Sequence, residues 1–303
     1  MGGYVQQNVY GKDSEAAAVQ AADAVQALEN TISWRIPGSE LLEFNSRAGK
    51  TWLTLSDSLF SVLTTAQDVA ENSNGAFDVT IAPVSRLWDF GSDRQEVPAA
   101  EDIAVMLQNV DYQVLRLNND HSASLKNTGT AVDLSSISDG AACDAAVSAY
   151  RENEISAAII SVSDSVGVYG KKPDGTLWNI AVRDPLSSDA LGSLYLDEGF
   201  LSTADISQNA FTENAVTYHS ILDPKTGYPA KKGLLSVIVF SDSGTLSDAL
   251  DNACFVLGQE DGMALLDRYG AEGVFISDDH VIFVTDGLKT RFTLTADNYT
   301  LSK

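Results

Sequence analysis

Apolar residues recur every three or four positions along five stretches of the chain, and polar residues fill the positions between them. In the first stretch, Ala18, Ala22, Val25 and Leu28 keep this spacing. Side chains three and four residues apart lie on one face of an α-helix, so the pattern is that of a helix with one buried face. It predicts helices over 14–33, 56–71, 139–153, 247–257 and 259–269.

Shorter alternating or continuously apolar runs, bounded by turn residues, predict strands instead. They cover 77–81, 157–162, 166–169, 177–182, 234–240 and 291–295, and 273–285 is typical of a hairpin that turns at Asp278 and Asp279. Helices and strands follow one another without a regular βαβ rhythm, and no repeat or Pro/Gly/Ser linker interrupts them. The pattern favours an α+β fold with mixed or antiparallel sheets, in which residues 1–303 form one domain.

Composition and charge narrow the possible partners. The chain is 44% hydrophobic, enough for a large core, but no run of about 18 apolar residues predicts a transmembrane span. The N-terminus has no signal-peptide pattern, as would also be true of a processed or truncated N-terminus. Acidic residues number 42 against 19 basic ones, for a net charge of −23, which argues against nucleic acid or an anionic membrane as partner. The two cysteines, Cys143 and Cys254, fall in predicted helices, form no metal-binding pair and are expected in the core.

The segment 218–229, YHSILDPKTGYP, predicts a defined loop. Pro224 fixes its own φ and Gly227 allows a positive φ, so the chain turns sharply between them. Asp223, Thr226 and Tyr228 place polar groups on this loop. Taken alone, the segment is a turn between two apolar runs.

A candidate metal site lies on the predicted helix 247–257. Asp248, Asp251 and Asn252 are three and four residues apart, so they share a helix face. Two carboxylates and an amide oxygen suit a hard cation such as Mg²⁺ or Ca²⁺. The alternative is a solvated acidic patch that complements the dipole at the start of the helix.

Several segments in a fixed order resemble the ApbE family, the FAD:protein FMN transferases. They are MGGYVQQNVYG, SELLEFN, GAFDVTIAPVSRLWDFG, VDLSSISDGAACD, ISVSDSVGVYGKKPDGTLWNIAVRDP, YHSILDPKTGYP and SDALDNACFVLG. The resemblance covers essentially the whole chain. It implies a single compact, T-fold-like α+β domain with a flavin cleft between two lobes.

The resemblance also implies a ligand set for Mg²⁺. The family pattern Asp-Ala-Leu-x-Thr corresponds here to 248–252, so Asp248 is retained as the main candidate ligand and Asn252 stands in place of Thr. The family's backbone carbonyl from a distant loop corresponds to that of Ser136. Asp139 falls where the family has Lys or Glu, and as an alternative it is simply the N-cap of the following helix.

Flavin-binding positions carry over in the same way. The residues that match them are Met1, Trp34, Phe77, Asp78, Asp133, Asp139 and Ile221. Trp34 falls close to an aromatic residue that stacks on the flavin in the family. The alternative for Trp34 is a packing role at the edge of the core.

Several flavin-site positions depart from the family pattern. A Gly-Gly pair is Ser163-Asp164 here, and Thr-Ser-Gly is 203–205, Thr-Ala-Asp. If Asp205 points inward, its carboxylate would repel a pyrophosphate by about 4 kcal/mol at 4 Å and an effective dielectric near 20. The family His before Ile-Ile-Asp-Pro is Ser220, and His219, one residue earlier, is expected to face the other way as a partly exposed surface residue.

Two functions follow from this comparison. The first is a divergent, Mg²⁺-dependent flavin transferase or FAD pyrophosphatase, with FAD and an acceptor protein as partners. The second is a non-catalytic relative that binds a flavin or another ligand weakly, or serves as a scaffold. The resemblance further implies an extracytoplasmic location, since family members are commonly exported lipoproteins.

Overall fold

The computed structural model describes residues 4–93 and 95–302. The helices in this part of the chain are α1 (Ser14–Ile32), α2 (Glu40–Ser46), α3 (Asp57–Asn72), α4 (Ala82–Trp88), α5 (Ala100–Leu107), the 3₁₀ turn Tyr112–Val114, α6 (Ser138–Glu152), α7 (Gly244–Leu257) and α8 (Gln259–Tyr269). All five predicted helices are present as α1, α3, α6, α7 and α8. The predicted bounds of α8 are those of the structure.

Most strands belong to one large sheet. Its order is β1 (Val5–Tyr10), β5 (Ala157–Val162), β6 (Ser165–Tyr169), β9 (Gly199–Asp205), β12 (Leu234–Ser241), β13 (Glu272–Ser277), β14 (Val281–Val284) and β16 (Thr300–Leu301). All neighbours in this sheet are antiparallel except β14 and β16. The smaller sheets are formed by β15 (Phe292–Leu294), β8 (Ala190–Leu196) and β7 (Trp178–Arg183), by β2 (Leu53–Thr54), β4 (Ser122–Leu125) and β3 (Leu115–Leu117), and by β10 (Phe211–Glu213) with β11 (Val216–Tyr218). The predicted α+β class with antiparallel and mixed sheets is confirmed.

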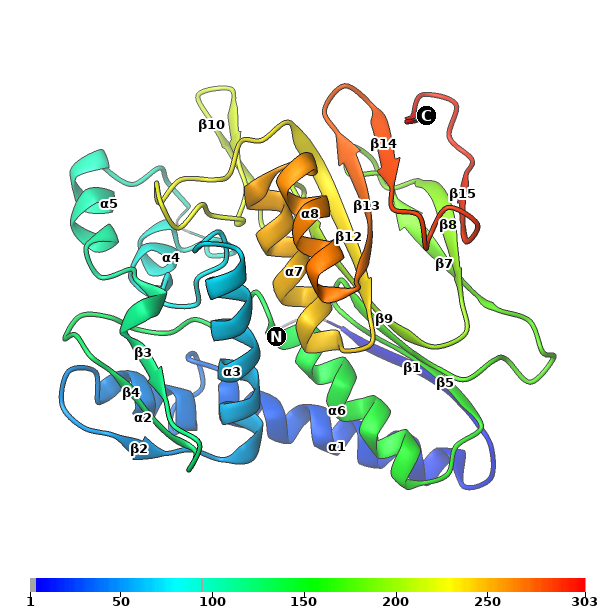
Figure 1. Ribbon diagram of the computed structural model, residues 1–303, viewed down its shortest axis with the longest axis horizontal. Helices are drawn as coiled ribbons and strands as arrows, with labels where there is room; N and C mark the ends of the chain where they lie inside the picture. Colours follow the sequence, from blue (N-terminus) through cyan, green and yellow to red (C-terminus); the bar gives the residue numbers. More distant parts are fainter. Residues whose placement is uncertain (1–3, 94, 303) are drawn as a thin grey trace.

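The central strands of the large sheet are buried on both faces, and this explains why the sequence of β12 is almost continuously apolar. Val237 and Val239 pack into the core on the helix side, while Ile238 between them packs with β7 and β8 on the other side. Successive strand residues point to opposite faces, so a strand with two covered faces needs apolar residues at every position. Figure 1 shows α7 and α8 beside β12 and β13, with α6 and α1 continuing this helical layer.

The predicted strand 77–81 is wrong. The segment is a turn that leads into α4, and a side chain holds it. Asp78 accepts hydrogen bonds from the backbone N–H and the hydroxyl of Thr80 at 2.8 and 2.7 Å, and from the backbone N–H of Tyr112 at 2.9 Å. A short carboxylate side chain that bonds its own backbone competes with strand pairing, and Pro83 then favours the start of a helix.

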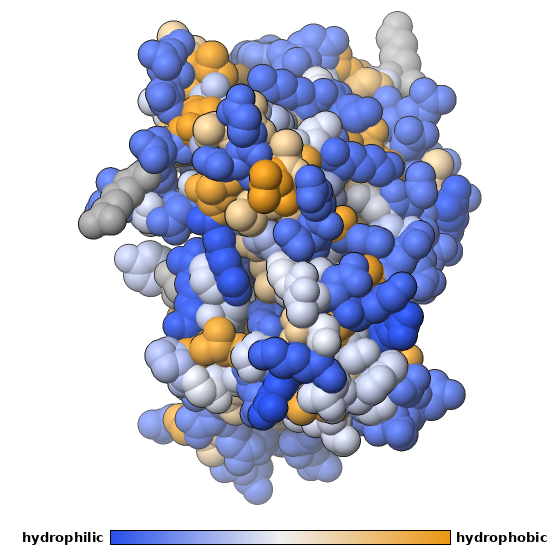
Figure 2. Space-filling model, turned by 90° about the vertical axis from the view of Figure 1, so that its left-hand side faces the viewer, coloured by the Kyte–Doolittle hydropathy of each residue, from blue (hydrophilic) through white to orange (hydrophobic). Residues whose placement is uncertain are grey.

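The face on the left of Figure 1 is mostly hydrophilic. Figure 2 shows it, with hydrophobic residues in small separate patches among the polar ones. Such scattered apolar residues are ordinary for a protein surface. No helix in the described part of the chain combines the length and hydropathy needed to cross a bilayer.

Candidate active site

A cavity of about 730 Å³ opens between the C-terminal end of α1, the region of α4, and the β5–β6 turn with strand β9 of the large sheet. It brings together nine residues that the sequence had predicted as flavin or metal ligands: Trp34, Phe77, Asp78, Asp133, Ser136, Asp139, Ile221, Asp248 and Asn252. Asp251 does not line it, and Met1 lies outside the described residues. Their roles as ligands stay predictions.

The loop before α6 forms the floor of the cavity, and local hydrogen bonds fix it. Asp133 accepts from the backbone N–H and the hydroxyl of Ser135 at 2.9 and 2.6 Å. Asn45 on α2 bonds both backbone groups of Val132, donating to the carbonyl at 2.8 Å and accepting from the N–H at 2.7 Å. The loop is therefore held in one conformation, with the carbonyl of Ser136 near the cavity.

Two glycines let α6 and α7 meet at the end of this loop. A Cβ on Gly140 would lie 2.0 Å from the carbonyl oxygen of Gly244, and one on Gly244 would lie 2.2 Å from that of Gly140. Only residues without a side chain allow this approach. The contact also places the N–H of Gly140 2.8 Å from Oδ2 of Asp248, to which it donates.

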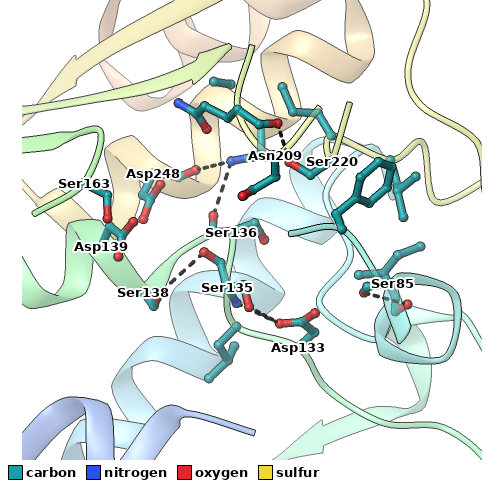
Figure 3. A pocket seen from close by; sticks show the side chains of 18 of the residues that line it. Ser85, Asp133, Ser135, Ser136, Ser138, Asp139, Ser163, Asn209, Ser220 and Asp248 are labelled. Carbon is teal, nitrogen blue, oxygen red and sulfur yellow. Dashed lines mark hydrogen bonds between the residues drawn. The ribbon is translucent and has the colours of Figure 1, made fainter. Parts of the chain in front are cut away.

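Oxygen groups gather where α6, α7 and the β5–β6 turn meet. Figure 3 shows Asp139, Ser163 and Asp248 close together, with Ser136 nearby. Asp248 is buried, and burial with the nearby Asp139 charge raises its pKa to about 8. Burial likewise raises the pKa of Asp139 to about 6, and its Oδ1 has no hydrogen-bond partner in the described part of the chain. Within residues 4–93 and 95–302, no Lys, Arg or His side chain forms an ion pair with Asp139 or Asp248, so a bound cation would stabilise the charged form of both carboxyl groups.

The structure contradicts the two alternative interpretations of these acidic residues, a solvated acidic patch on α7 and an N-cap role for Asp139. Asp248 and Asp251 are 8% and 1% exposed, so they are not a solvated patch. Asp139 is not an N-cap, because Ile137 holds that position and Asp139 lies in the first turn of α6. Sequence spacing alone could not show that α6 covers this face of α7.

Asn252 is hydrogen-bonded as a donor. Its Nδ2 lies 2.8 Å from Oδ1 of Asp251 and 3.4 Å from the carbonyl of Ser136. The oxygens of Asp248 and Ser136 therefore suit a hard cation directly, whereas the Asn252 amide would have to turn to present its oxygen. In the described residues, no group of three or more His, Cys, Asp or Glu side chains has the arrangement of a metal site.

Most of the positions that depart from the family pattern line the cavity. Asp164, whose pKa is raised by burial, does so, as do Ser163, Ala204, Ser220 and Asn252. Asp205 does not, because its carboxylate accepts from the N–H of Ser207 at 2.7 Å instead. The carboxylate of Asp205 therefore does not point into the cavity, as that argument requires, although its charge contributes to the raised pKa of Asp164.

His219 is 8% exposed, so the prediction of a surface histidine is wrong. Its ring meets the edge of Phe255 at 5.4 Å between centroids, and Nε2 lies 3.2 Å from the carbonyl of Ala230. Ser220 lines the cavity and His219 does not, as alternation along an extended segment predicts.

The fold and the cavity define an α+β protein with a cavity of about 730 Å³ lined by polar and apolar residues. Residues 1–275 match the model of the ApbE family, and the chain belongs to that family. It is 28% identical to the FAD:protein FMN transferase of Treponema pallidum, over 95% of this chain and 84% of the relative. A relative of the same description from Klebsiella pneumoniae is 26% identical over 97% of this chain and 92% of its own length.

The fold is that of a solved structure as well. The ApbE protein of Thermotoga maritima superposes with a TM-score of 0.87 and 26% sequence identity, covering 96% of both chains. The relatives thus extend over nearly the whole chain, and the resemblance inferred from the ordered segments is confirmed.

Proposed function

We propose that this protein is a Mg²⁺-dependent flavin transferase, which takes FAD and passes FMN to a hydroxyl group of an acceptor protein. The observation that carries the proposal is the cavity, which has oxygen donors at one end and the aromatic residues Trp34 and Phe77 elsewhere in its lining. Its volume lies within the roughly 300–1,000 Å³ of small-molecule sites. Relatives described as FAD:protein FMN transferases support the same activity.

In this proposal, Asp248 and the carbonyl of Ser136 hold the cation, with Asp139 close by. Bound Mg²⁺ supplies Lewis-acid stabilisation of pyrophosphate charge. The chain itself positions the reactants. Asn45 and Asp133 keep the Ser136 loop rigid, and the contact of Gly140 with α7 fixes Asp248 against it. Fixed donors of this kind reduce the reorganisation needed in the transition state.

A second function is favoured by a separate observation. Asp164 brings a carboxylate to the cavity wall, and Ser220 offers no imidazole there. A unit charge about 4 Å from a phosphate would cost about 4 kcal/mol at an effective dielectric near 20. On this reading the protein is a non-catalytic relative that binds a flavin weakly.

Two measurements distinguish the two proposed functions. The first is FAD titration with and without Mg²⁺. The second is an assay of AMP release and of covalent flavin on an acceptor protein used by a related transferase. Transfer that needs Mg²⁺ and is lost in Asp248→Asn supports the first function. FAD binding without AMP release or transfer supports the second. The matched control is Asp286→Asn, an exposed acid far along the chain that does not line the cavity. Absence of FAD binding under all conditions would refute both.

A further inference from the structure

β1 is one edge of the large sheet, and three of its residues present backbone groups that have no partner. It pairs with β5 alone, in an antiparallel arrangement. The carbonyls of Tyr4 and Tyr10 face β5, since they accept hydrogen bonds at 3.2 and 3.1 Å from the residues that flank it. Backbone groups point to alternate sides along a strand, so those of Val5, Gln7 and Val9 point away from the sheet. In residues 4–93 and 95–302, no hydrogen bond reaches the N–H or C=O groups of these three residues.

The other strand edges in the described part of the chain have features that oppose pairing. At the far edge of the large sheet, β16 has only two residues, and the edge strands β2, β3, β10, β11 and β15 have two or three. β7 has six residues, as β1 does, but it ends in Arg183 and its register shifts there. Short strands, charges and bulges keep sheet edges from joining. Residues 4–10, YVQQNVY, contain no charged residue and no proline, and the pairing of β1 has no register shift.

One face of β1 is also uncovered. Gln6 and Asn8 are exposed and border a hollow with Ile159 and Ser161 of β5. On the opposite face, the side chain of Gln7 donates to a backbone carbonyl of α1 at 2.9 Å. β1 is therefore anchored to its own helices on one face, while its edge and its other face are open to a partner.

The strand is complementary to itself when two copies meet edge to edge. If Gln7 lies opposite Gln7 of a second copy in antiparallel register, Val5 lies opposite Val9 of that copy. These are the residues whose N–H and C=O groups point outward, so each pair exchanges two backbone hydrogen bonds. A two-fold axis then passes between the two Gln7 residues, which is the symmetry of most homodimers.

The side chains on the open face match in the same register. Gln6 lies opposite Asn8 of the second copy, and their amides are both donors and acceptors. Tyr4 lies opposite Tyr10 of the second copy, and these side chains are 88% and 40% exposed. Aromatic and hydrogen-bonding pairs across antiparallel strands contribute roughly 0.2–1 kcal/mol each. No charge opposes another along residues 4–10, although each copy carries a net charge of −23.

We propose that two copies of this chain associate through β1, edge to edge, and so join their large sheets into one continuous sheet. The association requires no flavin, cation or transfer reaction, so it is independent of the proposed function. A single strand edge is a small interface, below the roughly 1,200 Å² of stable complexes, and we expect it to depend on protein concentration. Because the copies repel each other through their net charge, salt should tighten the association, whereas it would weaken a contact between opposite charges.

Sedimentation velocity of the full chain over a range of concentrations tests the proposal. The average mass should rise from the 32.3 kDa of one chain towards twice that value. Gln6→Lys/Asn8→Lys places lysines opposite each other on both sides of the axis and should weaken the association about tenfold or more. Gln6→Asp/Asn8→Asp should weaken it likewise. An equimolar mixture of the two variants should associate at least as tightly as the wild type, because each lysine then lies opposite an aspartate.

The matched control is Thr212→Lys/Thr300→Lys, which adds the same charge at exposed positions on β10 and β16 and should not weaken the association. Circular dichroism verifies that each variant is folded. A wild type that is monomeric at about 1 mM would overturn the proposal. So would association that persists in Gln6→Lys/Asn8→Lys, that is lost equally in the control, or that the mixture of oppositely charged variants does not restore.

Discussion

Gly140→Ala should be among the most damaging small substitutions in this protein. The new Cβ would lie 2.0 Å from the carbonyl oxygen and 2.5 Å from the carbonyl carbon of Gly244, and 2.7 Å from Cβ of Asp248. Cβ atoms essentially never approach other heavy atoms within 3.0 Å, so the two helices must separate by about 1 Å. No flexible side chain can absorb the change, because two of the three atoms belong to the backbone.

Two effects set the magnitude. Overpacking between rigid elements costs about 1–3 kcal/mol. Separating the helices also stretches the 2.8 Å hydrogen bond from Gly140 to the Asp248 carboxyl group. Because the pKa of Asp248 is raised to about 8, this group is largely uncharged at neutral pH, and such a bond contributes about 0.5–1.5 kcal/mol. We expect Gly140→Ala to lower the free energy of unfolding by about 2–4 kcal/mol, a large part of the roughly 5–15 kcal/mol of a typical domain.

Urea denaturation followed by circular dichroism measures this loss. Gly287→Ala is the matched control, because its Cβ would meet only the side chain of Glu272. This flexible, half-buried side chain can turn away at the loss of its 3.0 Å hydrogen bond from the N–H of Gly287, so the change should stay within about 1 kcal/mol. Gly244→Ala disturbs the same contact from the other side, so the double variant should cost less than the two single variants together. Equal unfolding midpoints for Gly140→Ala and Gly287→Ala would refute the reasoning.

Three further predictions concern the cavity and its supports. Asp164→Asn removes a negative charge from the lining and should tighten FMN binding severalfold, measured by fluorescence titration; an unchanged affinity would show that this carboxyl group does not act on the ligand. Asn45→Asp replaces the donor to the Val132 carbonyl by an oxygen and should cost about 1–3 kcal/mol in urea unfolding, whereas retained stability would mean that the loop is held by other contacts. Burial lowers the pKa of His219 below its usual 6.5, so the unfolded chain binds the proton first and the wild type should lose stability as pH falls below about 6.5. Unfolding of His219→Gln at pH 7 and 5 should lack this component, and an identical pH dependence in both proteins would contradict it.

Local patterns in the sequence predicted the helices and strands whose buried positions follow a regular period. The helix Gln259–Tyr269 and the strand Ala157–Val162 have the bounds that their periodicity predicts. The prediction failed at 77–81, where the Asp78 carboxylate bonds the backbone and replaces strand pairing with a turn. Sequence alternation could not show this, since a strand and a side-chain-stabilised turn share the same short apolar pattern.

The site was predicted by matching ordered segments rather than by local physics. That match located most of the lining, but it could not orient individual side chains. Asp205 turns to the N–H of Ser207, and Asn252 donates to Asp251. The stacking of Arg86 on Trp34 joins residues far apart in sequence, and nothing in either segment signals it.

The cavity takes its lining from separate segments near residues 34, 77, 134, 164, 204, 221 and 248. Contacts between such distant segments form only after the entropy of closing long loops has been overcome, so the site is completed late in folding. A ligand that binds the completed cavity then stabilises the native state and not the folding transition state. In stopped-flow measurements, FMN should slow unfolding in proportion to its stabilisation, while the rate of refolding stays as it is without ligand.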